Sequence, residues 1–485
     1  MKARQLWLTL GASLWFIPSA MVAGSIALAI ALIELSVHVD VATVARMPRL
    51  FGAGADGARG MLSTIAGSII TVAGVAFSLT IAALAQASSQ YTPRVLRTFM
   101  GDRSSQVVLG TFVGIFAYCL VVLRTIRGGD EGAFVPPIAV LGGFLLAIVG
   151  VGVLVFFIHH TASGLQASTI LARVRRTTET AIDTVFPVEL AHGEEDPPPG
   201  DASTRLANED WRPVPALRTG YIQSVDVDGL AACALSRAMI IRVERSVGAF
   251  AIEGDPLVSV TRAPAGNGHP EDGDSDEGVT EQINDFFTID NYRTVEQDPA
   301  FGILQIVDIA LRALSPGIND TTTAVTCVDH LSALLVRLAR RRVAPAAAPA
   351  SLASVGAAYP VITSDPTFAD LLALALDDVR RSAGGNVTVL GGLIDAIAIT
   401  ARHASAPSRR RHLARHLEHL DAAIRQSVQS DEDRISLASR VAAARQTLLH
   451  ADARTAQGPG DPRVRSDSTL IGIARAGTKR SGEIT

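Results

Sequence analysis

Four long stretches of this chain contain no charged residue, and they constrain its fold more than any other feature. They run over Gln5–Ile33, Met61–Tyr91, Ser104–Leu123 and Gly132–Ile158. A helix needs about 20 apolar residues to cross the hydrocarbon core of a bilayer, and each stretch is long enough. Backbone groups in lipid must satisfy their own hydrogen bonds, so each stretch is expected to be helical.

The sequence therefore predicts an α-helical integral membrane protein with four transmembrane helices, at about residues 10–34, 61–88, 104–124 and 134–159. Lys2 and Arg4 precede the first stretch, as basic residues precede the apolar region of a signal peptide. That stretch is longer than a typical signal-peptide apolar region, which favours a retained helix.

The distribution of basic residues near the helix ends predicts the orientation. With the N-terminus inside, eight Lys and Arg residues lie on the cytosolic side and five on the outer side. Cytosolic flanks carry the excess of Lys and Arg in most membrane proteins. Four spans also place both termini on one side, so we expect a multi-pass protein of the bacterial inner membrane with both termini in the cytosol.

Composition supports this division between membrane and cytosol. The chain is 48% hydrophobic and 19% charged, with a mean hydropathy of +0.30, and the apolar excess lies before residue 160. A net charge of -4 argues against a nucleic-acid partner, which would require a basic surface. The three cysteines are far apart and form no CxxC pair, as expected for reduced thiols in a cytosol.

We expect the remainder to be a cytosolic α+β domain, mostly helical with a small β module. The predicted parts are a transmembrane domain at 1–160, a membrane-proximal helix and acidic linker at 161–218, a small β-rich module at 219–262, a cytosolic helical domain at 279–450 and a disordered tail at 451–485. The β module alternates apolar and polar residues between glycines at turn spacing, whereas the helical domain shows apolar residues at a spacing near 3.6.

The second transmembrane stretch has an unusual face. Gly60, Gly67 and Gly74 recur every seven residues, accompanied by hydroxyl residues that include Thr71 and Ser78. Small residues let helices in lipid approach closely, so this face is a candidate packing face. The alternative is that the same face, repeated around an oligomer, lines a polar pathway. Gly110 and Gly114 form a GxxxG pattern in the third stretch, which we interpret as packing.

A second set of candidate residues marks a corner of the helical domain: Arg293, Asp298, Asp308, Ser315, Asn319 and Asp320. Ser315-Pro316-Gly317 should end one helix, and Asn319 or Asp320 should cap the next. Arg293 is expected to pair with Asp298 or Asp308 in a buried ion pair. The alternative is a ligand or partner site, because amides at a helix N-terminus can bind an anion.

Two patterns suggest metals but lack part of what a metal site requires. His412, His416 and His419 share a helix face, yet Arg409, Arg410, Arg411 and Arg415 crowd the same turns and would repel a dication. Asp272, Asp274 and Asp276 start like a calcium loop, but the required Gly and the bidentate Glu are missing. We predict no metal at either place.

No catalytic motif is recognisable in the chain. There is no Gly-rich phosphate loop, no HExxH and no GxSxG. The sequence therefore predicts a protein that is not an enzyme and that carries no cofactor.

Four segments carry a resemblance to a known family. They are Gln90-Tyr91-Thr92-Pro93-Arg94, Phe156-Phe157-Ile158-His159-His160, Gly220-Tyr221-Ile222-Gln223 and, above all, Ala310-Leu311-Arg312-Ala313-Leu314-Ser315-Pro316-Gly317-Ile318-Asn319-Asp320. Over roughly residues 10–425 the chain resembles a bacterial family of predicted membrane proteins, domain of unknown function 2254. The family has proline after the Asp of the last motif, where this chain has Thr321. The resemblance implies membrane topology and localisation and gives no activity.

The leading functional hypothesis is a homo-oligomeric channel or transport-related assembly with a cytosolic regulatory domain. It rests on the glycine and hydroxyl face of the second helix. The alternative is a membrane-anchored signalling or scaffolding protein that recruits a soluble cytosolic protein through the corner between Arg293 and Asp320. Either function places the chain in contact with the lipid bilayer.

Overall fold

The computed structural model describes a mostly helical chain with a small region of sheet, and this part of the predicted fold is confirmed. The described residues are 15–38, 54–90, 103–127, 134–164, 166–190, 194–195, 210–262, 276–343, 361–363 and 365–456. Asp272 and Asp274 of the calcium-like loop and most of the acidic linker lie outside them, whereas Asp276 is the first residue of a described helix. The last helix continues to Ala456, into the segment expected to be a tail, and the residues after 456 lie outside the described part.

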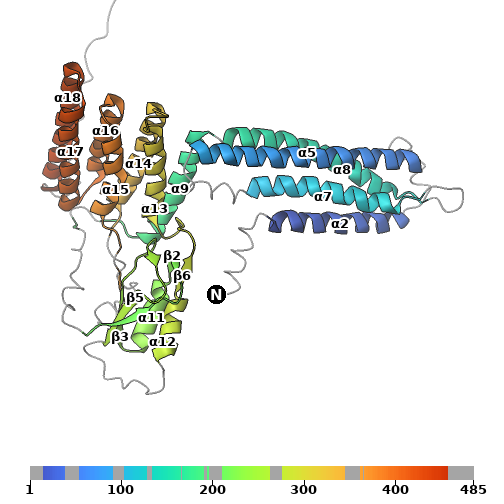
Figure 1. Ribbon diagram of the computed structural model, residues 1–485, viewed down its shortest axis with the longest axis horizontal. Helices are drawn as coiled ribbons and strands as arrows, with labels where there is room; N and C mark the ends of the chain where they lie inside the picture. Colours follow the sequence, from blue (N-terminus) through green and yellow to red (C-terminus); the bar gives the residue numbers. More distant parts are fainter. Residues whose placement is uncertain are drawn as a thin grey trace, which may run out of the picture.

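The four uncharged stretches fold into an elongated bundle of helices (Figure 1). Its members are α2 (Phe16–Val37), α5 (Ala55–Gln90), α7 (Arg103–Thr125) and α8 (Pro137–Gly164). Helix α7 packs against the other three, and α8 also contacts α2 and α5. The bundle core consists of alanines and larger apolar residues such as Leu62, Phe112, Ile115 and Tyr118.

Small residues on α7 determine how closely α2 approaches it. A Cβ added at Gly110 would lie 2.6 Å from Met21 Sδ and 3.0 Å from Pro18 Cα. A Cβ added at Gly114 would lie 2.6 Å from Ser25 Oγ. The GxxxG pattern therefore lies in a contact between two helices of one chain, as small residues do in other membrane bundles.

Five described helices are long and apolar enough to cross a membrane. Their mean hydropathies are 2.2 for α2, 2.1 for α5, 2.2 for α7, 2.8 for α8 and 1.2 for a fifth helix, α14 (Thr321–Arg340). The sequence predicted only the first four. Helix α14 meets this criterion of length and composition because it has nearly as many apolar residues as a membrane span. These residues are, however, concentrated on one buried face.

A helical core follows the bundle and contains α14. The other helices are α9 (Ala167–Val185), α13 (Pro299–Ala313), α15 (Phe368–Ser382), α16 (Val387–His403), α17 (Pro407–Ser427) and α18 (Asp431–Ala456). Helices α9, α13 and α16 pack around α14, and α18 packs on α16 and α17 (Figure 1). Their buried leucines, isoleucines, valines and alanines form one continuous apolar core.

Two small sheets lie beside the helical core (Figure 1). One has the strand order β1-β5-β3-β7, from β1 (Arg212–Pro215), β5 (Pro256–Arg262), β3 (Met239–Val243) and β7 (Val361–Ile362). The other has the order β4-β2-β6, from β4 (Phe250–Ala251), β2 (Gly220–Val225) and β6 (Phe287–Asp290). Among the strands that the structure describes, only the β3–β7 pair is parallel. Helices α11 (Val227–Ser236) and α12 (Asp276–Asp285) complete this region.

The sheets draw strands from a longer part of the chain than 219–262, where the sequence placed the β module. Strands β1, β6 and β7 all lie outside that range. Such short strands give little periodicity of their own. Their pairing is decided by neighbours, as when Ile241 of β3 meets Val361 of β7 across 120 positions of sequence.

We predict that Gly110→Leu destabilises the bundle, because the new side chain would collide with the backbone of α2 at Pro18. Overpacking of this kind costs roughly 1–3 kcal/mol. Gly24→Leu on α2 is the matched control, since a Cβ there meets no described atom within 4 Å. The melting temperature of the full chain in detergent should fall for Gly110→Leu and stay unchanged for Gly24→Leu. Equal melting temperatures for the two variants would contradict the α2–α7 contact.

Candidate functional site

The N-terminus of α13 is built around the carboxylate of Asp298. Its Oδ1 accepts a hydrogen bond from the Phe301 amide at 3.0 Å, so Asp298 is the N-cap that ends the preceding loop. Its Oδ2 accepts hydrogen bonds from Arg293 Nε at 3.0 Å and Nη2 at 2.7 Å. Asp298 is only 4% exposed, so its carboxylate lies in the interior, whereas the Arg293 side chain is 25% exposed.

A loop and an aromatic ring enclose this ion pair. The Arg293 guanidinium lies 4.9 Å from the centroid of the Phe301 ring, in cation–π geometry. Gly248, in the loop before β4, approaches so closely that a Cβ there would collide with Asp298 and Arg293. Its φ of +85° is also a conformation that favours glycine. Burial raises the pKa of Asp298 although the Arg293 guanidinium opposes the shift, so the ionised carboxyl depends on that partner.

Two glutamines that sequence reasoning did not single out connect the same corner to β2. Val225 N donates to Gln297 Oε1 at 3.0 Å, and Gln223 Nε2 donates to the Tyr292 carbonyl at 3.0 Å. Gln223 lies in a segment that carries the family resemblance, and Gln297 directly precedes Asp298, but no local sequence pattern predicts either hydrogen bond. The bonded groups are about 70 residues apart in the chain, and only the fold brings them together.

The opposite end of α13 holds the other candidate residues. Ser315 O accepts hydrogen bonds from Ile318 N at 3.0 Å and Asn319 N at 2.9 Å, and Asn319 takes a left-handed φ of +47°. Asp320 then caps α14, accepting from Thr323 N at 3.0 Å and from Thr323 Oγ1 at 2.5 Å. These bonds hold the pKa of Asp320 below its ordinary value.

The candidate corner therefore separates into two places. Helix α13 has 15 residues, which corresponds to about 22 Å of helix between Asp298 and Ser315. Of the two carboxylates expected to pair with Arg293, the structure brings Asp298 to it. Asp308 lies partly buried in the middle of α13, about 15 Å along the axis from Asp298. Asn319 and Asp320 form the turn into α14, where Asp320 is the cap.

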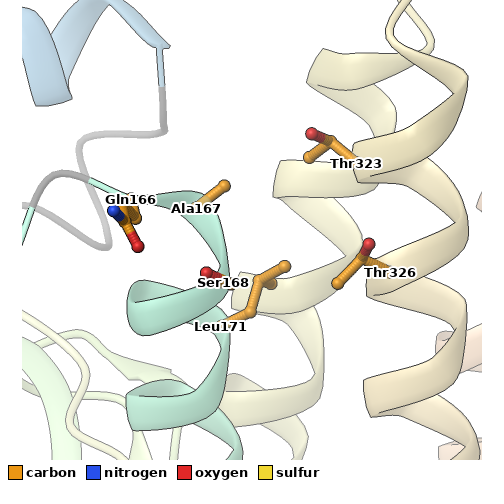
Figure 2. Close-up of a pocket in the computed structure, with 6 residues that line it drawn as sticks. All are labelled: Gln166, Ala167, Ser168, Leu171, Thr323 and Thr326. Atoms are coloured by element: carbon orange, nitrogen blue, oxygen red, sulfur yellow. The ribbon is translucent and has the colours of Figure 1, made fainter. Parts of the chain in front are cut away.

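A pocket lies beside that turn, between the first turns of α9 and α14 (Figure 2). Its volume is about 350 Å³, and its lining residues are Gln166, Ala167, Ser168, Leu171, Thr323 and Thr326. Thr326 Oγ1 donates to the Thr322 carbonyl at 2.9 Å, and the Thr323 hydroxyl is bonded to Asp320. No carboxylate, lysine, histidine or cysteine is among these lining residues. The pocket therefore offers hydroxyl and apolar contacts, without an acid–base pair in its wall.

The glycine face of α5 points away from the other helices of the bundle. A Cβ added at Gly60, Gly67 or Gly74 would meet no described atom within 4 Å, and Thr71 and Ser78 are exposed. The opposite face, which includes Leu62 and Ile69, packs in the bundle core. Within one chain, this small-residue face is thus an outer surface, and it is the GxxxG of α7 that packs inside.

We predict that Arg293→Ala destabilises the full chain by roughly 3–5 kcal/mol, because it leaves a buried carboxylate without its partner. Arg425→Ala is the control, since its ion pair with Asp421 is exposed on the arginine side and should contribute about 0–1 kcal/mol. Thermal unfolding in detergent measures both. Equal losses of stability in Arg293→Ala and Arg425→Ala would show that the Arg293–Asp298 pair contributes no more than an exposed ion pair.

Comparisons with known proteins give a family and uncharacterised relatives. A family model described as "Predicted membrane protein (DUF2254)" matches residues 11–398. Uncharacterized proteins of Mycobacterium bovis and of Mycobacterium tuberculosis strain H37Rv are each 35% identical over 356 residues, 73% of this chain and 65% of the relative. The chain thus matches about 65% of the length of these curated relatives. No solved structure matches the chain.

Proposed function

Because the chain belongs to the DUF2254 family of predicted membrane proteins, as its motifs indicated, we propose that it forms a homo-oligomeric channel in the bacterial inner membrane. The observation that carries this proposal is the outward small-residue face of α5. In the oligomer, this face meets the same face of other subunits around a common axis.

The three open glycine positions of α5 support a protein contact there. Both α5 and α8 also expose large apolar residues that suit lipid chains, such as Val75 and Phe77 of α5 and Ile148 and Val155 of α8. The small-residue face of α5 offers little side-chain surface to lipid and instead allows a second backbone to approach. The hydroxyls of Thr64 and Thr71 donate hydrogen bonds to the carbonyls of Gly60 and Gly67, at 2.7 and 2.9 Å. The face therefore carries polar groups whose hydroxyl donors already have hydrogen-bond partners.

In this proposal the bundle of α2, α5, α7 and α8 spans the membrane four times, and everything from α9 onward lies in the cytosol with both termini. Helix α14 then belongs to the helical core. It has the lowest hydropathy of the five apolar helices, and nine of its residues are buried in the core between α9, α13 and α16. Its Arg337 also pairs with Asp183 of α9, a contact that suits water better than lipid.

The oligomer is tested by enlarging the glycines of α5. Gly67→Leu and Gly74→Leu should leave each subunit folded, because no described atom lies nearby, and should weaken association at least tenfold, about 1.4 kcal/mol. Gly152→Leu on α8 is the matched control, since that glycine is equally open. Cross-linking and native mass spectrometry in detergent give the subunit number. A monomeric native protein, or Gly67→Leu subunits that assemble as well as Gly152→Leu subunits, would reject the proposal.

Conduction is a separate outcome. Purified oligomer in planar bilayers should show single-channel currents, which Gly67→Leu should abolish and Gly152→Leu should preserve. An intact oligomer without current under voltage, tension or pH steps would reject the channel and leave only the assembly.

The topology is tested by cysteine labelling in intact cells. The three native cysteines are buried and should give a low background. Arg127→Cys, at the outer end of α7, should react with an impermeant maleimide. Ser436→Cys, on the exposed face of α18, should react only after the membrane is permeabilised. Labelling of Ser436→Cys in intact cells would invert the proposed orientation.

A further inference from the structure

Three side chains with metal-ligating atoms come together where α15 packs against α17. They are Asp377 of α15 and His416 and His419 of α17, and one ligand atom from each lies within 4.8 Å of the others. His416 and His419 are three residues apart and therefore share a face of α17. Their rings lie 5.9 Å apart, between centroids, at an interplanar angle of 68°. Asp377 comes from 39 positions earlier in the sequence, so no local pattern contains the set.

The central pair of atoms has the spacing of metal ligands. Asp377 Oδ1 and His416 Nδ1 are 3.4 Å apart, and Asp377 Oδ1 is a buried atom with no hydrogen-bond partner. Two ligands held about 2.0–2.1 Å from a tetrahedral ion lie about 3.4 Å from each other. An ion between them would give this buried oxygen a ligand bond in place of the hydrogen bond that it lacks.

Burial differs along the site in a way that suits an ion with one open position. The His416 side chain is only 11% exposed, whereas His419 is exposed at the surface. An ion could therefore enter from the side of His419, and water could occupy the fourth position. Two imidazoles and a carboxylate form a donor set typical of zinc and other late first-row dications.

Two of the four arginines that argued against a metal at these histidines are bonded elsewhere, and the other two, Arg411 and Arg415, are exposed to solvent. Arg409 donates to the carbonyls of Leu338 and Arg341, at 3.0 and 2.7 Å. Arg410 donates to the carbonyls of Ala404 and Ser405, at 3.0 and 2.9 Å. Both are buried near the start of α17, away from His416 and His419.

One arginine does lie at the cluster. Arg380 Nη2 is 3.5 Å from Asp377 Oδ1, and Arg380 Nε is buried without a hydrogen bond. The neighbouring Arg381 is paired with Asp378, so the two carboxylates of this turn offset the two guanidinium groups. The Arg380 contact is to the same oxygen, Oδ1, that faces His416, so binding of an ion there requires Arg380 to shift to the second oxygen of the carboxylate, which can accept it.

We propose that Asp377, His416 and His419 bind a divalent transition metal ion of the zinc class, which links α15 to α17. Such an ion joins two helices of the core that are separated in sequence by α16.

The test uses the full chain in detergent, purified without a polyhistidine tag, stripped with a chelator and titrated with Zn²⁺ by calorimetry. The native protein should bind one Zn²⁺ per chain and gain melting temperature. Asp377→Asn and His419→Gln should weaken binding at least tenfold. His419 is exposed, so His419→Gln keeps the fold intact even if changes at buried His416 do not.

His412→Gln is the matched control, one turn earlier on the same helix, and should bind Zn²⁺ like the native chain. The proposal is overturned if the native protein shows no saturable binding of one ion per chain. It is equally overturned if His419→Gln binds as well as the native chain, or if His412→Gln loses as much affinity as His419→Gln.

Discussion

The packing of α9 against α13 and α14 is the interaction on which the arrangement of the whole chain depends. Helix α8 ends at Gly164 and α9 begins at Ala167, so α9 carries the chain directly from the membrane bundle into the helical core. Its buried Ile170, Leu171, Val174 and Ile182 belong to that core. Burying an aliphatic side chain contributes roughly 1.5–3 kcal/mol, whereas an exposed ion pair contributes about 0–1 kcal/mol. Apolar burial therefore dominates the docking of α9.

Polar and steric contacts then determine the position of α9 against α13 and α14. Asp183 accepts hydrogen bonds from both Arg337 and Arg341 at the end of α14, which lowers the pKa of its carboxyl. Gly302 of α13 lies against the Thr178 side chain, where a Cβ would collide. The 350 Å³ pocket is formed by the first turns of the same two helices, α9 and α14, so its shape depends on the same docking. The membrane bundle and the helical core are thus coupled through one helix.

Some features of the predicted sites follow from neighbouring residues in the sequence, and others depend on contacts that the sequence does not reveal. The end of α13 could be located, because the Ser315-Pro316-Gly317 break is a local signal of a stop. The partner of Arg293 could not be chosen between Asp298 and Asp308, because that choice depends on how the loop turns before α13. Likewise, the glycines of α5 and of α7 look alike in sequence, yet those of α7 contact α2 and those of α5 face outward.

The sequence by itself determined four of the five segments that are apolar enough for a membrane, that the rest is mostly helical, and the family to which the chain belongs. These properties follow from composition, periodicity and motifs within about 20 neighbouring residues, whose physical effects are local. Only the tertiary structure decided that strands β1, β6 and β7 join the sheets, that α14 lies in a helical core, and that Asp377 meets His416. Each of these depends on contacts between residues far apart in the chain, and such contacts form only when whole helices and strands pack to bury their apolar faces together.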